Sequence, residues 1–408
     1  MHRPKINIHG TMLALSSALD FVGIDEVSHG KRVAMMARQI AMKLGWPDEE
    51  CYSILVAGLL HDCGVSESRE HRKLTATLEW EGAEEHCIRG ANYLSGCKLF
   101  AHFAPEIRHH HTRWERLQGL PLENRIRRRA NLLYLADRVD VLLLPLLGGQ
   151  DFLLGCPDIV ARIQILAGSL FEPRLVEAFA AVAQVDAFWL SLEPEYLNED
   201  LFRLGVDRDT ALLEYSELKE IARLFSIVVD AKSPYTKEHS MRVGLLARCL
   251  AENFGFRADD LEEIEVAGFL HDIGKLRLSE DIIEKPGKLT PEERACIHRH
   301  SYDTYRILQR VFVDGRIPIW AGLHHENLLG EGYPFRTTGL ELDIVTRIIS
   351  VADIFQALAQ DRPYRKGYSL EEILNDLRER VKIGEVDGTV VEELARKGSE
   401  YHALATGK

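Results

Sequence analysis

The sequence has no Cys-x-x-Cys pair, and its seven cysteines are scattered at positions 51, 63, 87, 97, 156, 249 and 296. An odd, unpatterned set predicts reduced thiols and a cytoplasmic protein. No apolar run reaches the roughly 18 residues of a membrane span, and none follows Met1 as in a signal peptide. The net charge of -13 argues against DNA or RNA polymers as partners, although a small anion needs only a local cationic pocket.

Long alternating runs of β-branched residues are also missing. Apolar residues instead recur at steps of three and four, as in Val33, Met36, Ile40 and Leu44. The stretch Thr290-Pro291-Glu292-Glu293 predicts a helix start, with a threonine cap, proline at the first position and a capping-box glutamate. These patterns predict an all-α fold, and 408 residues exceed one ordinary core.

The two halves of the chain are related by an internal repeat with an offset of 210 residues. Two unrelated helical segments of similar composition would not share so many non-apolar landmarks, so the repeat indicates a duplication. The matching landmarks are Ser16 and Ser226, Asp20 and Asp230, His29 and His239, Arg32 and Arg242, Gly45 and Gly255, Ala57-Gly58 and Ala267-Gly268, and His61-Asp62 and His271-Asp272.

We therefore expect two tandem helical domains, one over residues 1–200 and one over residues 213–408, joined by a linker over 201–212. A helix over Ala211–Val229 should connect them or pack between them.

The second half contains histidines and aspartates at positions that suit metal ligands better than a core. His271-Asp272 ends an apolar helical segment, and His324-His325 precedes a turn with glycines at 330 and 332. Imidazole nitrogens and carboxylate oxygens bind iron, manganese, zinc and similar ions. One such histidine alone would be an ordinary core or surface residue. The complete set is His239, His271, Asp272, His300, His324, His325 and Asp353.

With this set and the stretch from His324-His325-Glu326 to Gly332-Tyr333-Pro334, residues 213–385 resemble the HD-GYP branch of the HD-domain phosphohydrolases. That family hydrolyses cyclic dinucleotides, chiefly cyclic di-GMP. His298 is left out of the ligand set because His300 is followed by the family's helical tail. The resemblance implies one ion held by His239, His271, Asp272 and Asp353, and a second, bridged by Asp272, held by His300, His324 and His325.

The resemblance also implies the roles of further residues. Asp272 and Lys275 would be catalytic, in cleavage by a hydroxide that two metal ions activate. Lys275, Arg362 and Arg365 would bind phosphates, and Tyr333 would line a guanine pocket. As alternatives, Lys275 could be a helix C-cap cation and the arginines could form surface ion pairs. Iron or manganese is the favoured metal, with zinc, nickel or cobalt possible.

The sequence departs from the family pattern at three positions. Leu329 stands where many relatives have aspartate before the last glycine, and Ser233 replaces a frequent aspartate. Tyr235 stands where some members carry a glutamate that recruits a third ion, which favours two ions here. The exact dinucleotide, and whether hydrolysis stops at the linear product, stay open.

The first half repeats the ligand order without the phosphate-binding residues. Val65 replaces the lysine, Leu120 replaces the tyrosine, and Leu146 and Gly149 stand near the expected arginines. We expect a divergent HD domain that binds one or two metals for structure or regulation, or that has its own substrate. Cys63 and Cys87 adjoin ligands but are interpreted as buried small hydrophobes. The expected second metal site comprises His29, His61, Asp62, His86, His109, His110 and Asp137.

Three functions are therefore compared. The first is a metal-dependent phosphodiesterase acting on cyclic di-GMP in the second half, with a homodimer or a signalling protein as a possible partner. The second is a phosphohydrolase for another nucleotide, such as cyclic GMP-AMP. The third is a catalytically weak nucleotide sensor. Lys275, Arg362 and Arg365 argue against the sensor for the second half, and their absence favours it for the first.

Overall fold

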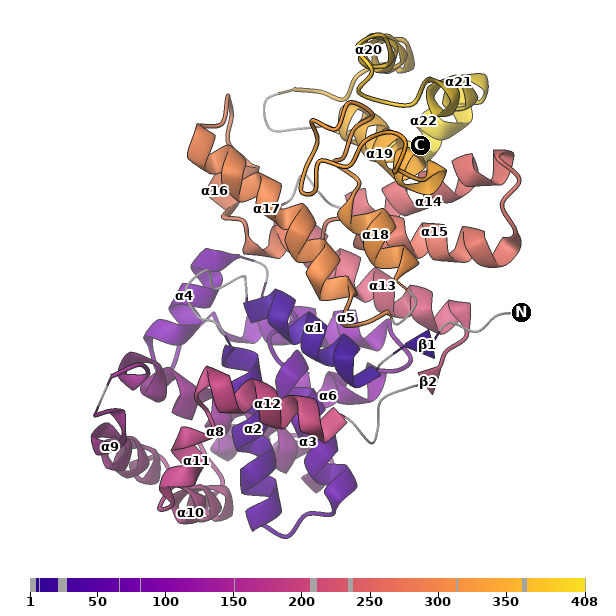
Figure 1. Cartoon of the computed structure of the whole chain (residues 1–408). Coiled ribbons are helices and arrows are strands. Elements are labelled where there is room, and N and C mark those ends of the chain that lie inside the picture. The colour runs from indigo at the N-terminus through magenta and orange to yellow at the C-terminus, as the bar shows by residue number, and fades with distance from the viewer. Residues whose placement is uncertain are drawn as a thin grey trace. The chain divides into compact units, whose positions relative to one another are not determined.

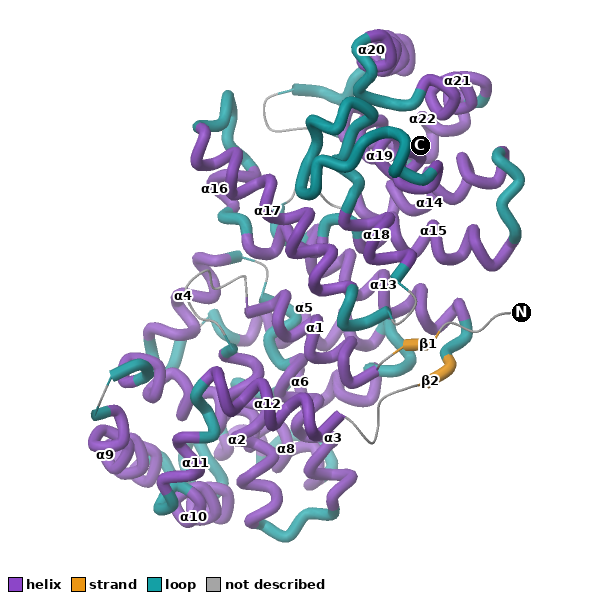
Figure 2. The backbone as a smooth tube through the Cα atoms, in the orientation of Figure 1, coloured by secondary structure: helices purple, strands orange, loops and turns teal. Residues whose placement is uncertain are grey.

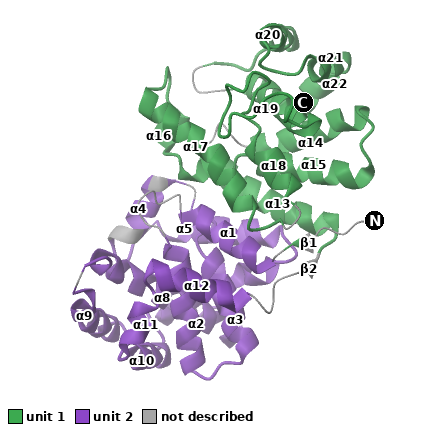
Figure 3. Ribbon diagram, in the orientation of Figure 1, with its two compact units in different colours: residues 1–7, 210–408 green, residues 8–209 purple. Residues whose placement is uncertain are grey.

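The computed structural model describes residues 5–6, 8–20, 28–65, 67–80, 82–149, 151–205, 211–233, 238–312, 315–361 and 365–407. Its contacts divide the chain into two compact units, shown in Figure 3. The N-terminal unit comprises residues 8–209, and the C-terminal unit comprises residues 1–7 and 210–408. The sequence had placed residues 1–7 with the first half.

Helices make up the regular structure of the N-terminal unit (Figure 1). They are α1 (Ile8–Asp20), α2 (His29–Lys43), α3 (Asp48–Leu60), α4 (Ser68–Ala76), α5 (Glu84–Ser95), η2 (Ala101–Phe103), α6 (Ala104–Arg108), α7 (Trp114–Leu117), α8 (Asn124–Leu143), η3 (Leu144–Leu146), α9 (Phe152–Ile165), α10 (Pro173–Val182), α11 (Asp186–Leu190) and α12 (Pro194–Gly205).

The C-terminal unit is also helical, apart from one pair of two-residue strands (Figure 2). Its elements are β1 (Lys5–Ile6), β2 (Ala211–Leu212), α13 (Tyr215–Asp230), α14 (His239–Asn253), α15 (Ala258–Leu270), η4 (Ile273–Arg277), α16 (Glu280–Ile283), α17 (Pro291–Leu308), α18 (Arg316–Gly322), α19 (Ile344–Ala359), α20 (Leu370–Lys382), α21 (Gly388–Arg396) and α22 (Gly398–Thr406). The predicted all-α class is confirmed. None of the described helices combines the length and apolar character that a membrane crossing requires.

The helix starts follow from local side-chain chemistry. The capping box predicted at Thr290 is confirmed: its hydroxyl accepts from the Glu293 N–H at 3.2 Å, and its own N–H donates to the Glu293 carboxylate at 2.7 Å. A second box, between Glu214 and Glu217, starts α13 at Tyr215. The helix expected from Ala211 therefore begins four residues later, because Ala211 and Leu212 pair with Ile6 and Lys5 as β2 and β1.

The repeat appears in both units as one central helix packed between two others. In the N-terminal unit α2 packs against α3 and α8, and in the C-terminal unit α14 packs against α15 and α19. Glycines permit the first of these contacts. A Cβ on Gly58 would lie 2.5 Å from the Ala34 Cα, and a Cβ on Gly268 would lie 2.4 Å from the Gly244 Cα. The helix just before the His-Asp pair, α3 or α15, therefore lies against the helix that begins with the first histidine, α2 or α14.

A second glycine in each unit brings the next histidine helix close to the His-Asp pair. A Cβ on Gly64 would lie 2.0 Å from the His86 carbonyl oxygen, and a Cβ on Gly274 would lie 2.0 Å from that of His300. Non-bonded atoms cannot approach so closely, so only glycine permits this packing. The distance between Asp272 and His300 thus depends on Gly274.

We predict that Gly274→Ala lowers the free energy of unfolding by about 1–3 kcal/mol, the usual cost of overpacking. The added methyl would push α17 away from η4 and separate Asp272 from His300. Urea unfolding followed by circular dichroism measures the change. Gly96→Ala is the control, because a Cβ there would lie 3.5 Å from the Tyr93 carbonyl oxygen, an ordinary van der Waals contact. Equal effects of the two variants would contradict the packing argument.

Candidate metal centres

The C-terminal unit brings together all seven of the residues expected as ligands. They come from the first residue of α14, the end of α15, the middle of α17, the turn after α18 and the middle of α19. His271, His300 and His324 are at most 1% exposed, and Asp272 is 2% exposed. The members are His239, His271, Asp272, His300, His324, His325 and Asp353.

Asp272 lies at the centre and presents its two oxygens to different imidazoles. Its Oδ2 is 3.5 Å from His239 Nε2 and 3.3 Å from His271 Nε2. Its Oδ1 is 3.5 Å from His300 Nε2 and 3.7 Å from His324 Nε2. Asp353 completes the first group, with Oδ1 3.2 Å from His239 Nε2. Two ligand groups therefore meet at one carboxylate.

Backbone carbonyls orient these rings. The Nδ1–H of His271 donates to Gly268 O at 2.7 Å, and the Nδ1–H of His324 donates to Ala321 O at 2.6 Å. The Nδ1–H of His300 donates to Ile297 O in the same way. Each acceptor lies three residues before its histidine, so the helical turn itself aims Nε2 inward. Such contacts fix the tautomer in which Nε2 carries a lone pair.

His239 begins its helix and has no such carbonyl, and a side chain serves instead. Its Nδ1–H donates to Gln356 Oε1 on α19. Gln356 is fully buried, three residues after Asp353.

The inward-facing atoms fit a bound cation. Among the buried polar atoms of the described residues, His239 Nε2, His271 Nε2, His324 Nε2 and Asp272 Oδ1 have no hydrogen-bond partner. Buried polar atoms rarely remain unsatisfied. Nitrogen lone pairs and carboxylate oxygens facing a common space are the donor set of first-row divalent ions.

The two ligand groups differ in their protonation. Burial alone would lower the pKa of His271, but Asp272 and Asp353 outweigh it and raise the pKa to about 10. Burial, together with His325, lowers the pKa of His300 to about 3, and burial lowers that of His325 to about 4. The second group therefore offers neutral imidazoles at pH 7, whereas a metal must displace protons from the first.

A cleft of about 310 Å³ opens beside the C-terminal cluster, within the range of small-molecule sites. Lys275 lies on its wall with Nζ 2.5 Å from Asp272 Oδ2. Lys232 and Lys285, which the sequence reading missed, line the same cleft and pair with Glu280 and Glu293.

Tyr333 also lines the cleft, on the glycine-containing loop after His325. Its ring stacks on His298, with centroids 4.0 Å apart and planes 10° apart. His298 therefore belongs to the wall behind Tyr333, outside the metal cluster. The Glu326 carboxylate holds the loop by accepting from the backbone N–H groups of Phe335, Arg336 and Thr337 at 2.6–3.0 Å.

Arg365, which the sequence predicts to bind phosphate, contacts the end of a helix in the structure. Its guanidinium donates to the carbonyls of Ala357 at 2.9 Å and Leu358 at 3.1 Å, and it lies 4.4 Å from the Tyr368 ring centroid. These carbonyls belong to the last turn of α19, so Arg365 caps that helix. Arg362, Tyr235 and Tyr364 lie outside the described residues.

The N-terminal unit repeats the first ligand group. His29 Nε2 is 3.4 Å from Asp137 Oδ1 and 3.6 Å from Asp62 Oδ2, and the Nδ1–H of His61 donates to Gly58 O at 2.7 Å. The Nδ1–H of His29 donates to Asp140 Oδ2 at 2.7 Å. Asp140 occupies the position of Gln356, three residues after the ligand aspartate.

The second group of the N-terminal unit differs from the expected one. His110 and His111 join His86, and His109 does not. His109 is half-buried, with Nδ1 3.3 Å from the Thr112 hydroxyl. The sequence reading was wrong by one residue. The spacing of 24 residues from His86 to His110, equal to that from His300 to His324, is the signal that identifies the pair.

Cys87 also belongs to this group, with its sulfur 3.7 Å from His86 Nε2 and 4.0 Å from His110 Nε2. Burial would raise the pKa of the Cys87 thiol, but His110 and His86 outweigh it and lower the pKa to about 6. Cys63 is different: it points to Gly90 O at 3.7 Å, and burial raises its pKa.

The void beside the His-Asp pair is small in this unit. The space lined by His29, His61, Asp62 and Val65 measures only about 10 Å³. A separate pocket of about 170 Å³ lies beside His111, Tyr134 and Arg138. Arg138 is buried, and its guanidinium donates to Asp137 Oδ2 at 2.7 and 3.0 Å. A protein cation therefore already neutralises one of the carboxylates in this cluster.

Comparison with known proteins agrees with this duplication. Residues 27–142 and residues 223–390 each match a family model described as HD domain. A 3'3'-cGAMP-specific phosphodiesterase 1 from Vibrio cholerae is 38% identical over 408 residues, which cover 98% of this chain and 94% of the relative. A cyclic di-GMP phosphodiesterase from Thermotoga maritima is 34% identical over 188 residues, or 44% of this chain and half of the relative.

A solved structure shares the fold over nearly the whole chain. The crystal structure of a cyclic GMP-AMP-specific phosphodiesterase from V. cholerae matches with a TM-score of 0.66 and 24% identity, covering 96% of this chain and 97% of the other. This match shows the fold, and the near full-length relative at 38% identity shows the family. The chain belongs to the HD-GYP family of cyclic-dinucleotide phosphodiesterases and carries two HD domains in tandem.

Proposed function

We propose that the C-terminal unit is a metal-dependent phosphodiesterase that opens a cyclic dinucleotide by hydrolysis of a phosphodiester bond. The observation that carries this proposal is the position of Asp272, whose two oxygens face two separate groups of imidazoles. Two ions in such a site acidify water and neutralise charge on the phosphate. The proposed holders are His239, His271, Asp272 and Asp353 for one ion, and Asp272, His300, His324 and His325 for the other.

Side chains on the cleft wall would position the substrate beside the metal ions. Lys275 places an ammonium group at the boundary between Asp272 and the cleft, where a phosphate adjoining the metals would lie. Lys232 and Lys285 line the same wall but are paired with Glu280 and Glu293, so Lys275 is the proposed phosphate contact. Tyr333 lines the cleft and is the proposed contact for a purine base, with the His298 and His325 ring centroids 4.0 and 4.8 Å from its own.

The proposed substrate is 3'3'-cyclic GMP-AMP. The sequence reading favoured cyclic di-GMP and kept cyclic GMP-AMP as the alternative. The relative that matches both units is named for 3'3'-cGAMP, whereas the Thermotoga relative named for cyclic di-GMP matches 44% of the chain. Cyclic di-GMP therefore becomes the second candidate. Iron or manganese is the proposed metal, and a cytoplasmic location and a homodimer stay predictions.

The N-terminal unit is proposed to hold metal without turning over a dinucleotide. Val65 stands in place of the lysine, and the void that it lines with His29, His61 and Asp62 measures only about 10 Å³.

Asp272→Asn should reduce turnover of 3'3'-cyclic GMP-AMP by at least about 1,000-fold, because the shared carboxylate charge is lost while the volume is kept. We expect metal content of the C-terminal unit to fall as well, measured by elemental analysis beside the kinetics. Asp376→Asn, at a partly exposed ion pair on α20, should match the wild type. Wild-type turnover with full metal content in Asp272→Asn would exclude the shared-carboxylate mechanism.

Lys275→Ala should lower kcat/KM by roughly ten- to a hundred-fold, since a charge-assisted hydrogen bond is worth about 1.5–3 kcal/mol. Metal content should be unchanged, because an ammonium group has no lone pair to donate. Lys382→Ala is the control, with a side chain 68% exposed on α20. If Lys275→Ala kept full activity, Lys275 would have no role in phosphate binding.

A panel of cyclic dinucleotides tests the substrate itself. We expect kcat/KM for 3'3'-cyclic GMP-AMP to exceed that for cyclic di-GMP by more than about ten-fold, a ratio that corresponds to one well-placed polar contact. Product analysis by mass spectrometry would identify the linear dinucleotide. The reverse preference would return cyclic di-GMP to first place and leave the metal mechanism intact.

A further inference from the structure

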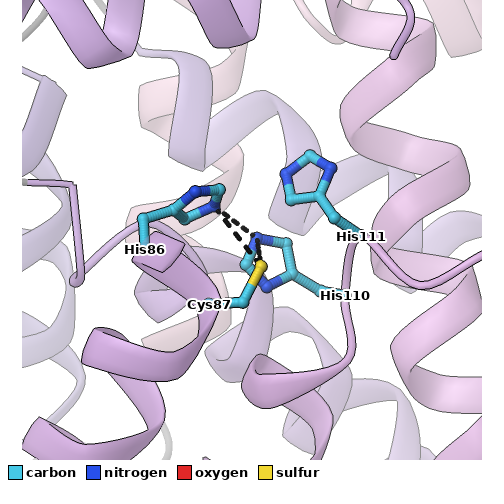
Figure 4. A group of neighbouring side chains, drawn as sticks. All are labelled: His86, Cys87, His110 and His111. Carbon is cyan, nitrogen blue, oxygen red and sulfur yellow. Dashed lines mark hydrogen bonds between the residues drawn. The ribbon is translucent and has the colours of Figure 1, made fainter. Parts of the chain in front are cut away.

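The N-terminal unit contains a group of four possible ligands that differs in kind from any in the C-terminal unit. His86 and Cys87 lie on α5, and His110 and His111 follow α6. Their ligand atoms all lie within 4.8 Å of one another. Figure 4 shows the Cys87 sulfur and the rings of His86 and His110 pointing toward one another, with His111 beside them.

The distances suit a tetrahedral ion. Zinc bonds of about 2.0–2.1 Å to nitrogen and 2.3 Å to sulfur imply edges of about 3.3 Å between nitrogens and about 3.6 Å between nitrogen and sulfur. His86 Nε2 and His110 Nε2 are 3.2 Å apart, and the Cys87 sulfur is 3.7 and 4.0 Å from them. Small shifts would centre an ion among these atoms.

The C-terminal unit shows what the cysteine changes. Ser301 follows His300 as Cys87 follows His86, and its hydroxyl is 3.3 Å from His300 Nε2. A neutral hydroxyl is a weak ligand, so the corresponding ion in the C-terminal unit would rely on the imidazoles and the shared Asp272, beside the cleft that His300 and His325 line. Cys87 would add a sulfur ligand in the N-terminal unit, and sulfur ligands are typical of structural zinc sites.

Charge and burial favour the thiolate ligand. Arg138 neutralises Asp137, whose Oδ2 is 3.4 Å from His111 Nε2, and Asp62 Oδ1 is 3.4 Å from His86 Nε2. A Cys87 thiolate would supply the second negative charge that a divalent ion needs. His86, Cys87 and His110 are at most 1% exposed, whereas His111 lines a pocket of about 170 Å³. A soft sulfur ligand selects zinc over manganese or magnesium.

We infer that Cys87, His86, His110 and His111 form a structural zinc site in the N-terminal unit. Zinc binding displaces the thiol proton to solvent and involves no change of oxidation state. The ion ties α5 to the turn that follows α6. The inference does not depend on the substrate of the C-terminal unit.

The test uses the full-length protein, stripped of metal and reloaded with cobalt(II) as a spectroscopic substitute for zinc. A thiolate ligand gives a sulfur-to-cobalt charge-transfer band in the near ultraviolet, which imidazole and carboxylate ligands do not give. We expect the band in the wild type and in Cys63→Ser, and its loss in Cys87→Ser. Cys63 is the matched control because it is equally buried and also adjoins a proposed ligand. Its neighbour Asp62 faces both ligand groups.

Elemental analysis, and a variant that adds a cysteine to the C-terminal unit, provide two further tests. Zinc content should fall by about one ion per chain in Cys87→Ser, whereas Ser301→Cys should add a second charge-transfer band from the C-terminal unit. Zinc absorption-edge spectra of the wild type should show a sulfur neighbour at about 2.3 Å, which tests the site even if Cys87→Ser fails to fold. A band and zinc content unchanged in Cys87→Ser, or a wild type without a sulfur neighbour, would overturn the inference.

Discussion

The burial of Asp272 among imidazoles is the constraint on which the C-terminal unit depends. A carboxylate and several ring nitrogens removed from water are costly unless they have partners, and the proposed partners here are metal ions. The protein prepares for them with rigid devices: helical carbonyls that orient His271 and His324, and Gln356 that orients His239. Close helix contacts at Gly268 and Gly274 bring these ligands within reach of one carboxylate.

The two units show how a duplicated scaffold can retain its metal ligands and lose its substrate site. The glycine contacts and the inward-facing histidines are the same in both, because they are properties of helix packing. The differences lie one to three positions after the ligands. Val65 replaces Lys275, Cys87 replaces Ser301, and Asp140 replaces Gln356. Asp140 also pairs with the buried Arg32, whereas the equivalent Arg242 donates to Leu404 O. Of the C-terminal residues replaced, Lys275 lines the cleft.

Sequence alone predicted the helical class, the repeat and the seven residues that the C-terminal unit brings together, because their order and spacing resemble a family pattern. It failed where side-chain direction, rather than position, decides. Three consecutive histidines after α6 left the register ambiguous, and His109 was chosen over His111. Arg365 has the expected position but turns to the carbonyls of α19. Gln356 gave no signal, since a glutamine in an apolar helix resembles any core-facing residue. Cys87 was interpreted as a small hydrophobe, because the partners of a thiol are visible only in three dimensions.

A structural zinc site would explain why the N-terminal unit keeps its ligands although Val65 stands in place of the lysine. The proposed ligands come from α5 and the turn after α6, and Asp62, at the end of α3, faces the same space. An ion that binds only the folded arrangement contributes about 4 kcal/mol when its concentration is a thousand times the dissociation constant. That amount is comparable with the whole stability of a marginal domain, about 5–15 kcal/mol. Loss of a ligand would then be selected against through folding, even in a unit that performs no catalysis. The residues expected to bind phosphate contribute no metal ligand and so carry no such constraint. They are the ones that differ in the N-terminal unit, where Val65 stands in place of Lys275.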